Sequence, residues 1–305
     1  MNPASAQSST TFREFLNVGL IQTTVDAASA WPKSVGPPMH ALEQARAWEE
    51  IRWCLRCFRN SHPKPHIILI PELAVPRGRI DDLQRAAMST GTVVIAGVDY
   101  NLDHQKQTVR NEAIVIIPDR WHKSERSWKA TSMVVGKTYP ARTEEAALQK
   151  AGGWRFEKEP HMWVFEAGEA GRFGIAICYD FLDLQRALMY RQQIQHLFVV
   201  SYNRDVESFL HMSESLARTI YCNVVVCNTG FHGGSLVVTP YYDPWLRTVY
   251  RHNGNQMLAH QVVQLPVASL IEAQNDNAPK ETFKSLPPGW DPGRMELVKR
   301  PFHLK

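Results

Sequence analysis

The chain has 305 residues, of which 44% are hydrophobic and 21% are charged, so it is long enough to bury a large core. Thirty-four basic and 30 acidic side chains leave a formal net charge of +4, a mild surplus spread along the chain that does not indicate a nucleic-acid partner. The five cysteines exclude a small disulfide-stapled scaffold, and we expect a reducing, cytoplasmic setting with at least one free thiol.

The start of the chain predicts neither export nor membrane insertion. Residues 1–11 are small and polar, without a cationic start followed by an apolar run, so we expect a flexible N-terminus rather than a secretory signal. The longest wholly apolar run, near 93–98, has the length of a strand, whereas a membrane-spanning helix needs about 20 such residues. We therefore expect no membrane partner.

Apolar runs of strand length alternate with helical patterns along the chain. Apolar residues recur every three or four positions over 39–59, which predicts a helix with one buried face. Further helices are predicted over 81–89, 183–193 and 207–221. The predicted strands cover 15–25, 66–71, 92–100, 111–118, 162–166, 172–178, 196–201, 224–228, 235–239 and 256–263. Without an internal repeat, this pattern predicts one α/β domain over residues 12–275.

Two segments lack periodicity. Residues 119–136 are polar and predict a surface loop, whose basic side chains could alternatively cover an anionic substrate; they are Arg120, His122, Lys123, Arg126 and Lys129. Residues 276–305 contain five prolines, which predicts an extended tail or a dimer arm.

Three reactive side chains occupy similar places in the predicted pattern. Glu72 ends the strand over 66–71, Lys137 follows the loop after 111–118, and Cys178 ends the strand over 172–178. Each residue alone is explained by ordinary turn chemistry. Because ligands bind at the carboxyl ends of strands in open α/β sheets, the three together predict a site.

Four motifs in sequence order resemble those of the carbon–nitrogen hydrolase (nitrilase-like) superfamily. They are ILIPEL at 68–73, KTYPARTE at 137–144, GIAICYD at 174–180 and GGSLVVTP at 233–240, and Asn111 in NEAIVI is a further match. The resemblance covers about residues 15–273. It implies a four-layer α-β-β-α sandwich, a homodimer or higher oligomer paired across helices, and a reaction without a metal or an organic cofactor.

The resemblance also implies the roles of the site residues. A free thiol is only a few per cent ionised at pH 7, so Cys178 needs Glu72 as a general base to attack an amide or nitrile carbon. Lys137 and the backbone N–H of Tyr179 would stabilise the oxyanion. Glu144 would orient Lys137 and contact the substrate; the alternative is an acid that only begins a helix. Water would then hydrolyse the thioester on Cys178.

Tyr179 and Asp180 resemble the amidase branches, so an amide is the favoured substrate. The sequence departs from the family pattern at 181–184, and again at 218–222, where Tyr221 replaces the usual Glu. These departures leave two alternatives open. One is a non-catalytic or regulatory binding module, and the other is a glutaminase or acyl-transfer partner of another chain.

Two histidines and an asparagine are further candidates for the same site. His211 and His232 lie in segments that border the pocket in relatives, and Asn203, which follows the strand over 196–201, is a further supporting candidate. The remaining cysteines, Cys54, Cys57, Cys222 and Cys227, are expected to be packing residues.

Overall fold

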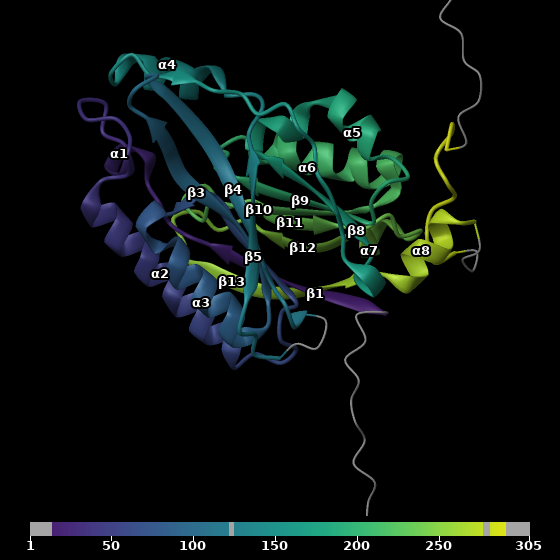
Figure 1. Ribbon diagram of the computed structural model, residues 1–305. Coiled ribbons are helices and arrows are strands. Elements are labelled where there is room, and N and C mark those ends of the chain that lie inside the picture. The colour runs from purple at the N-terminus through teal and green to yellow at the C-terminus, as the bar shows by residue number, and fades with distance from the viewer. Residues whose placement is uncertain (1–13, 122–124, 277–280, 291–305) are drawn as a thin grey trace, which may run out of the picture.

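The computed structural model describes residues 14–121, 125–276 and 281–290. Two β-sheets lie face to face, and helices cover the outer face of each sheet (Figure 1). Helices α2 (Ala41–Arg59) and α3 (Ile80–Thr90) lie on the first sheet, and α5 (Leu184–Tyr190) and α6 (Val206–Leu216) lie on the second. The predicted four-layer α-β-β-α sandwich is therefore confirmed. The predicted flexible segment 1–11 lies outside the described residues.

The first sheet has the strand order β13-β1-β2-β3-β4-β5, with β6 beside β4. Strands β1, β2 and β3 are parallel, because α2 and α3 supply the crossover connections that parallel neighbours need. The strand bounds are β1 (Phe15–Gln22), β2 (Ile67–Val75), β3 (Val93–Asp103), β4 (Thr108–Pro118), β5 (Ala130–Gly136), β6 (Arg155–Phe156) and β13 (Ala259–Pro266).

The second sheet has the strand order β12-β11-β10-β9-β8-β7, and β8, β9 and β10 are parallel. Every residue of β9 and β10 is buried, which explains the continuous apolar stretches 197–200 and 224–227 within them. The strand bounds are β7 (Val164–Glu166), β8 (Arg172–Ile177), β9 (His196–Ser201), β10 (Asn223–Asn228), β11 (Ser235–Val238) and β12 (Thr248–His252).

The main core fills the space between the sheets. Leu69 of β2 and Val199 of β9 belong to the same buried apolar cluster. The Cys227 thiol of β10 reaches the carbonyl oxygens of Ile21, at 3.2 Å, and Leu69, at 3.4 Å, on the opposite sheet. Cys222 is also fully buried, so the expected packing role of this pair of cysteines is confirmed.

The structure corrects the interpretation of residues 119–136 as a loop. Residues 130–136 form β5, an edge strand with three exposed and two half-buried residues, in which only the short stretch 133–135 is apolar. Lys137 consequently follows a strand rather than a loop. His122 and Lys123 lie outside the described residues. Helix α4 (Arg142–Lys150) and strand β12 were also not predicted.

The described part of the proline-rich tail packs on its own chain. Phe283 stacks on Tyr241 with ring centroids 5.1 Å apart, and the Trp290 indole N–H donates to the Gln274 carbonyl, 3.2 Å away, at the end of α8 (Ala268–Gln274).

Two further α-helices are short, α1 (Ala27–Ala30) and α7 (Pro244–Arg247). None of the described helices combines the length and the apolar character needed to span a bilayer.

Candidate active site

Glu72 sits where strand β2 loses its regular pairing. The register with β3 is interrupted between Ile70 and Val75, and Leu73 has a left-handed backbone with φ 57°. Gly97 of β3 lies against this irregularity, since a Cβ at Gly97 would be only 2.3 Å from the Glu72 Cα. The interruption turns the Glu72 side chain toward the other reactive groups.

Cys178 begins a single helical turn, residues Cys178–Leu182, directly after β8. Its φ of 46° is unusual for a residue with a side chain and marks a strained turn. The buried carboxylate of Asp180, in the same turn, accepts hydrogen bonds from the backbone N–H groups of Thr138, at 3.0 Å, and Tyr139, at 2.8 Å. Asp180 therefore ties the Cys178 turn to the segment that follows Lys137.

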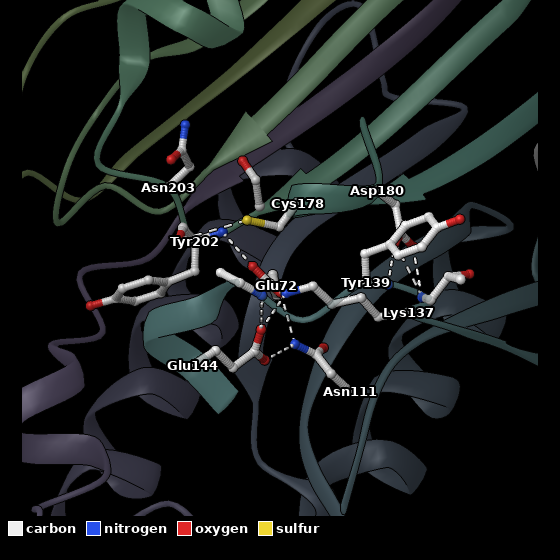
Figure 2. A network of polar contacts seen from close by, with 12 residues as sticks. Glu72, Asn111, Lys137, Tyr139, Glu144, Cys178, Asp180, Tyr202 and Asn203 are labelled. Atoms are coloured by element: carbon white, nitrogen blue, oxygen red, sulfur yellow. Dashed lines mark hydrogen bonds and ion pairs between the residues drawn. The ribbon is translucent and has the colours of Figure 1, made fainter. Parts of the chain in front are cut away.

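The Lys137 ammonium lies between two carboxylates (Figure 2). Its Nζ is 2.8 Å from Glu72 Oε1 and 2.6 Å from Glu144 Oε2. The side chains of Lys137 and Glu72 are each only 2% exposed, and that of Glu144 is 11% exposed. The structure thus brings the predicted Glu72, Lys137 and Glu144 into one buried cluster.

Neutral donors hold the two carboxylates in place. The Asn111 amide donates to Glu72 Oε1, at 2.7 Å, and to Glu144 Oε1, at 2.9 Å. The Tyr202 backbone N–H donates to Glu72 Oε2 at 2.8 Å, and the Tyr100 hydroxyl donates to Glu144 at 3.1 Å. Because several hydrogen bonds fix each carboxylate, neither can reorient freely.

Cys178 completes the cluster. Its Sγ lies 3.9 Å from the Tyr202 carbonyl oxygen, on the strand end that also binds Glu72 (Figure 2). Burial raises the pKa of the Cys178 thiol well above its usual value, the Glu72 charge raises it further, and the Lys137 charge opposes this. Cys178 is therefore a protonated thiol at neutral pH.

Lys137 and Glu144 remain charged despite their burial. Burial alone would lower the pKa of Lys137, but Glu72 and Glu144 together raise it well above its usual value. Burial would raise the pKa of Glu144, but the Lys137 charge and hydrogen bonds lower it overall. The site thus contains a fixed positive charge beside a thiol.

A cavity of about 450 Å³ opens onto these groups. Glu72, Lys137, Glu144 and Cys178 all line it. Its other walls are largely apolar and aromatic, formed by Trp31, Pro37, Leu73, Tyr100, Ala147, Leu148 and Tyr202 among others. This volume and this mixture of surfaces are typical of a small-molecule site.

No family model matches the sequence, and no curated protein is significantly similar to it. Solved structures nevertheless resemble it over most of its length. Saccharomyces cerevisiae Nit3, a member of branch 10 of the nitrilase superfamily, is 16% identical with a TM-score of 0.60, covering 88% of this chain and 97% of Nit3. The carbon–nitrogen hydrolase superfamily protein XC1258 of Xanthomonas campestris is 13% identical with a TM-score of 0.60, covering 93% of this chain and 99% of XC1258. This chain has the nitrilase-superfamily fold.

An amidase from Nesterenkonia sp. AN1 shares the nitrilase fold with this chain at 13% identity and a TM-score of 0.58. The match covers 85% of this chain and 94% of the amidase, which was solved with the acetamide moiety of fluoroacetamide added covalently at its active-site cysteine.

Within this nitrilase-like fold, two predicted supporting residues lie away from the buried cluster. The Asn203 side chain binds the backbone of Asp205 and points away from Glu72 and Lys137 (Figure 2). His211 is exposed on α6 and lines a different hollow, together with Arg218 and Arg247. The expectation that His211 borders the cavity is therefore not met.

Two other candidates lie nearer the cluster. His232 packs edge-on against Tyr202 with ring centroids 5.3 Å apart. The Tyr179 side chain is 46% exposed, so a role for Tyr179 rests on its backbone N–H, at the start of the helical turn, where N–H groups lack partners within the turn.

Tyr202 and Tyr100, which bind the two carboxylates, were not predicted as site residues. Tyr202 directly follows β9, but it binds Glu72 through its backbone N–H, so its side chain gives no sign of this contact. Among the described residues, no group of three or more His, Cys, Asp or Glu side chains could hold a metal ion.

Proposed function

We propose that the protein is a carbon–nitrogen hydrolase that cleaves a small amide through a thioester on Cys178. The observation that carries this proposal is the buried Glu72–Lys137–Glu144 ion cluster beside the Cys178 thiol, at one end of the cavity. Burying such charges costs stability unless each is paired, and strongly perturbed groups cluster at functional sites.

The first half of the reaction forms the acyl-enzyme. Glu72 accepts the Cys178 proton as the sulfur attacks the amide carbon, so the electron pair of the carbonyl moves onto its oxygen. Glu72 then donates that proton to the departing ammonia or amine, the carbon–nitrogen bond breaks, and a thioester remains. A protonated Cys178 requires such a base, because burial raises the pKa of its thiol.

Lys137 supports this step through its third N–H group. An ammonium carries three donors, and two of them bind Glu72 and Glu144, which leaves one for the cavity that Lys137 lines. That donor and the Tyr179 backbone N–H stabilise the oxyanion of the tetrahedral intermediate. One such donor typically contributes about 3–4 kcal/mol to lowering the barrier.

The second half of the reaction releases the acid. A water molecule gives its proton to Glu72 and attacks the thioester carbon. The carbon–sulfur bond then breaks, and Glu72 returns the proton to the sulfur. Glu144 is a positioning residue, because it contacts Lys137 and Asn111 rather than the sulfur.

The departures from the family pattern lie outside the cavity. Phe181 is buried and packs against Phe209 with ring centroids 5.2 Å apart. The Tyr221 hydroxyl donates to the Lys284 carbonyl in the described tail. Neither Phe181 nor Tyr221 lines the cavity that contains Cys178. The departures therefore leave the lining of that cavity unaltered, which favours a catalytic protein over an inactive binding module.

Ammonia release tests this function. Acetamide, propionamide and glutamine would be incubated with the purified protein and with Cys178→Ala, which keeps the fold but removes the nucleophile. We expect at least one amide to release ammonia with the wild-type protein only. Equal release by the two proteins would overturn the proposal, and release from glutamine alone would identify a glutaminase.

We also propose that two copies pair across helices, as the resemblance implies, and that α5 lies in the interface. Leu184, Leu188 and Met189 are 59%, 63% and 61% exposed, respectively, on this short helix. Such an apolar patch favours burial in an interface.

All five cysteines are free, which supports the proposed cytoplasmic setting.

A further inference from the structure

A second cavity, of about 530 Å³, lies between helices α2 and α3 on the outer face of the first sheet. None of its lining residues lines the cavity that contains Cys178. We call it the α2–α3 cleft and define it by its charged lining residues, which are Arg52, Arg56, Arg59, Lys64, Arg79, Asp82 and Arg126.

The α2–α3 cleft is strongly cationic. Its lining has six cations against one carboxylate, an excess of five, whereas the whole chain has a formal net charge of only +4. The single carboxylate, Asp82, is already bound by Arg79 at 3.0 Å. Within the described part of the chain, Arg56, Arg59 and Lys64 form no ion pair, so their charges are available to a ligand.

The cations form a row along one wall. Arg52, Arg56 and Arg59 are spaced four and three residues apart on α2, so they share one face over about 10 Å. Like charges at these spacings destabilise a helix. Favourable contact with the helix dipole explains cations in the last turn, Arg56 and Arg59. Arg52 pairs with Glu49 at 2.7 Å, and Arg126 lies over the Trp128 ring at 4.7 Å. Within the described residues, no ion pair accounts for Lys64.

The other surfaces of the cleft leave room and offer apolar contact. The α3 wall presents Ala86 and Ser89, whose side chains are small. The floor is formed by apolar and aromatic side chains, including Trp48, Phe58 and Ile68, which are buried. A ligand that fits must therefore combine several negative charges with an apolar or aromatic group.

We propose that the α2–α3 cleft binds a phosphorylated small molecule that carries an aromatic ring, of the nucleotide class. Guanidinium groups match phosphate oxygens in geometry and charge, and a row of them suits a chain of phosphates. The aromatic ring would lie on the apolar floor. The cavity volume is within the range of small-molecule sites.

Calorimetric titration with ATP, adenosine and inorganic triphosphate tests the proposal. We expect one ATP per chain, bound more weakly as the salt concentration rises and more tightly than either fragment. Arg56→Gln combined with Arg59→Gln should weaken ATP binding about tenfold or more, because each substitution removes charged hydrogen bonds. Arg155→Gln combined with Lys158→Gln removes two charges at exposed positions outside the cleft and should leave the affinity unchanged.

Circular dichroism shows whether the Arg56→Gln, Arg59→Gln variant is folded. If it is misfolded, the double variant Lys64→Gln with Arg126→Gln replaces it, because both of these residues lie in loops, and it should weaken ATP binding in the same way. No binding of ATP at millimolar concentration, or unchanged binding in both cleft variants, would overturn the proposal. Tighter binding of polyglutamate than of ATP would overturn it in favour of an acidic protein partner. Triphosphate that binds as tightly as ATP would overturn the aromatic part of the proposal.

Discussion

Lys137 Nζ lies 2.8 Å from Glu72 Oε1, and both side chains are only 2% exposed. A buried ion pair of this kind is stable only when the remaining charges and hydrogen-bonding groups also find partners. Glu144 and Asn111 supply those partners. The cluster therefore behaves as one unit, in which removal of any charged member leaves another uncompensated.

Lys137→Met should strongly destabilise the protein. The substitution leaves two buried carboxylates, Glu72 and Glu144, without their cation, and breaking a buried pair in this way costs about 3–5 kcal/mol. Urea denaturation measures the loss of unfolding free energy. The double variant Lys137→Met with Glu144→Gln should recover part of it, whereas a single variant as stable as the wild type would refute the description of the cluster as one unit.

Glu144→Gln should shift the alkaline limb of the activity profile to lower pH. Glu72 and Glu144 raise the pKa of Lys137, so loss of the Glu144 charge lowers that pKa and the lysine becomes neutral at a lower pH. A pH profile of kcat measures the shift. Glu145→Gln, at an exposed position one residue further along α4, is the matched control and should leave the profile unchanged.

His196 should make the protein less stable in mild acid. Its Nε2 lies 3.0 Å from the Ala170 carbonyl and its Nδ1 lies 3.0 Å from the Asn223 amide, which fits the neutral ring. Burial lowers the pKa of His196 to about 4 from 6.5, so between these values the unfolded chain binds a proton that the folded chain does not. The contribution of His196 to the free energy of unfolding is therefore fully present above pH 6.5 and is lost as the pH falls to about 4.

The expected loss is about 3 kcal/mol, from the size of the pKa difference. Urea denaturation at pH 7 and pH 4.5 measures it in the wild type and in His196→Gln. The variant should be less stable at pH 7 but should lose less stability on acidification. An equal loss in the two proteins would show that His196 does not titrate in this way.

Leu188→Asp should convert the proposed dimer into a monomer. The substitution places a charge in the centre of the exposed apolar patch of α5, where a partner would have to desolvate it. Light scattering with size-exclusion chromatography measures the mass. Leu42→Asp replaces a leucine that is 78% exposed on α2 and should leave the mass unchanged. A wild-type monomer would contradict the proposed pairing.

Most strands were predictable because buried parallel strands such as β9 and β10 are apolar between their polar ends. The four layers were predictable only from the family resemblance. The prediction failed for β5, whose exposed edge position allows polar residues, so Lys137 was expected to follow a loop. The convergence of Glu72, Lys137 and Cys178 was predictable because each residue interrupts or follows a strand. These strands are β2 and β5 of the first sheet and β8 of the second, and all three residues line one cavity.

Other parts of the site depend on packing that one sequence does not contain. Tyr202 binds Glu72 through its backbone N–H, which every non-proline residue has, so its identity carries no signal. The orientation of α6 decides that His211 faces away from the cavity, and it depends on contacts with the second sheet. The α2–α3 cleft likewise arises only when the two helices lie side by side.

The most direct test of the proposed catalytic unit is the rate at which iodoacetamide alkylates Cys178 in a Cys57→Ser background, followed by mass spectrometry. Cys57 is the only one of the five cysteines that is not buried, and Cys178, although buried, lines the cavity. If Glu72 acts as the base, Glu72→Gln should slow alkylation at pH 7 about 100-fold. If Glu72 acts only through its charge, which raises the pKa of the thiol, the same substitution should speed alkylation, and that result would contradict the account.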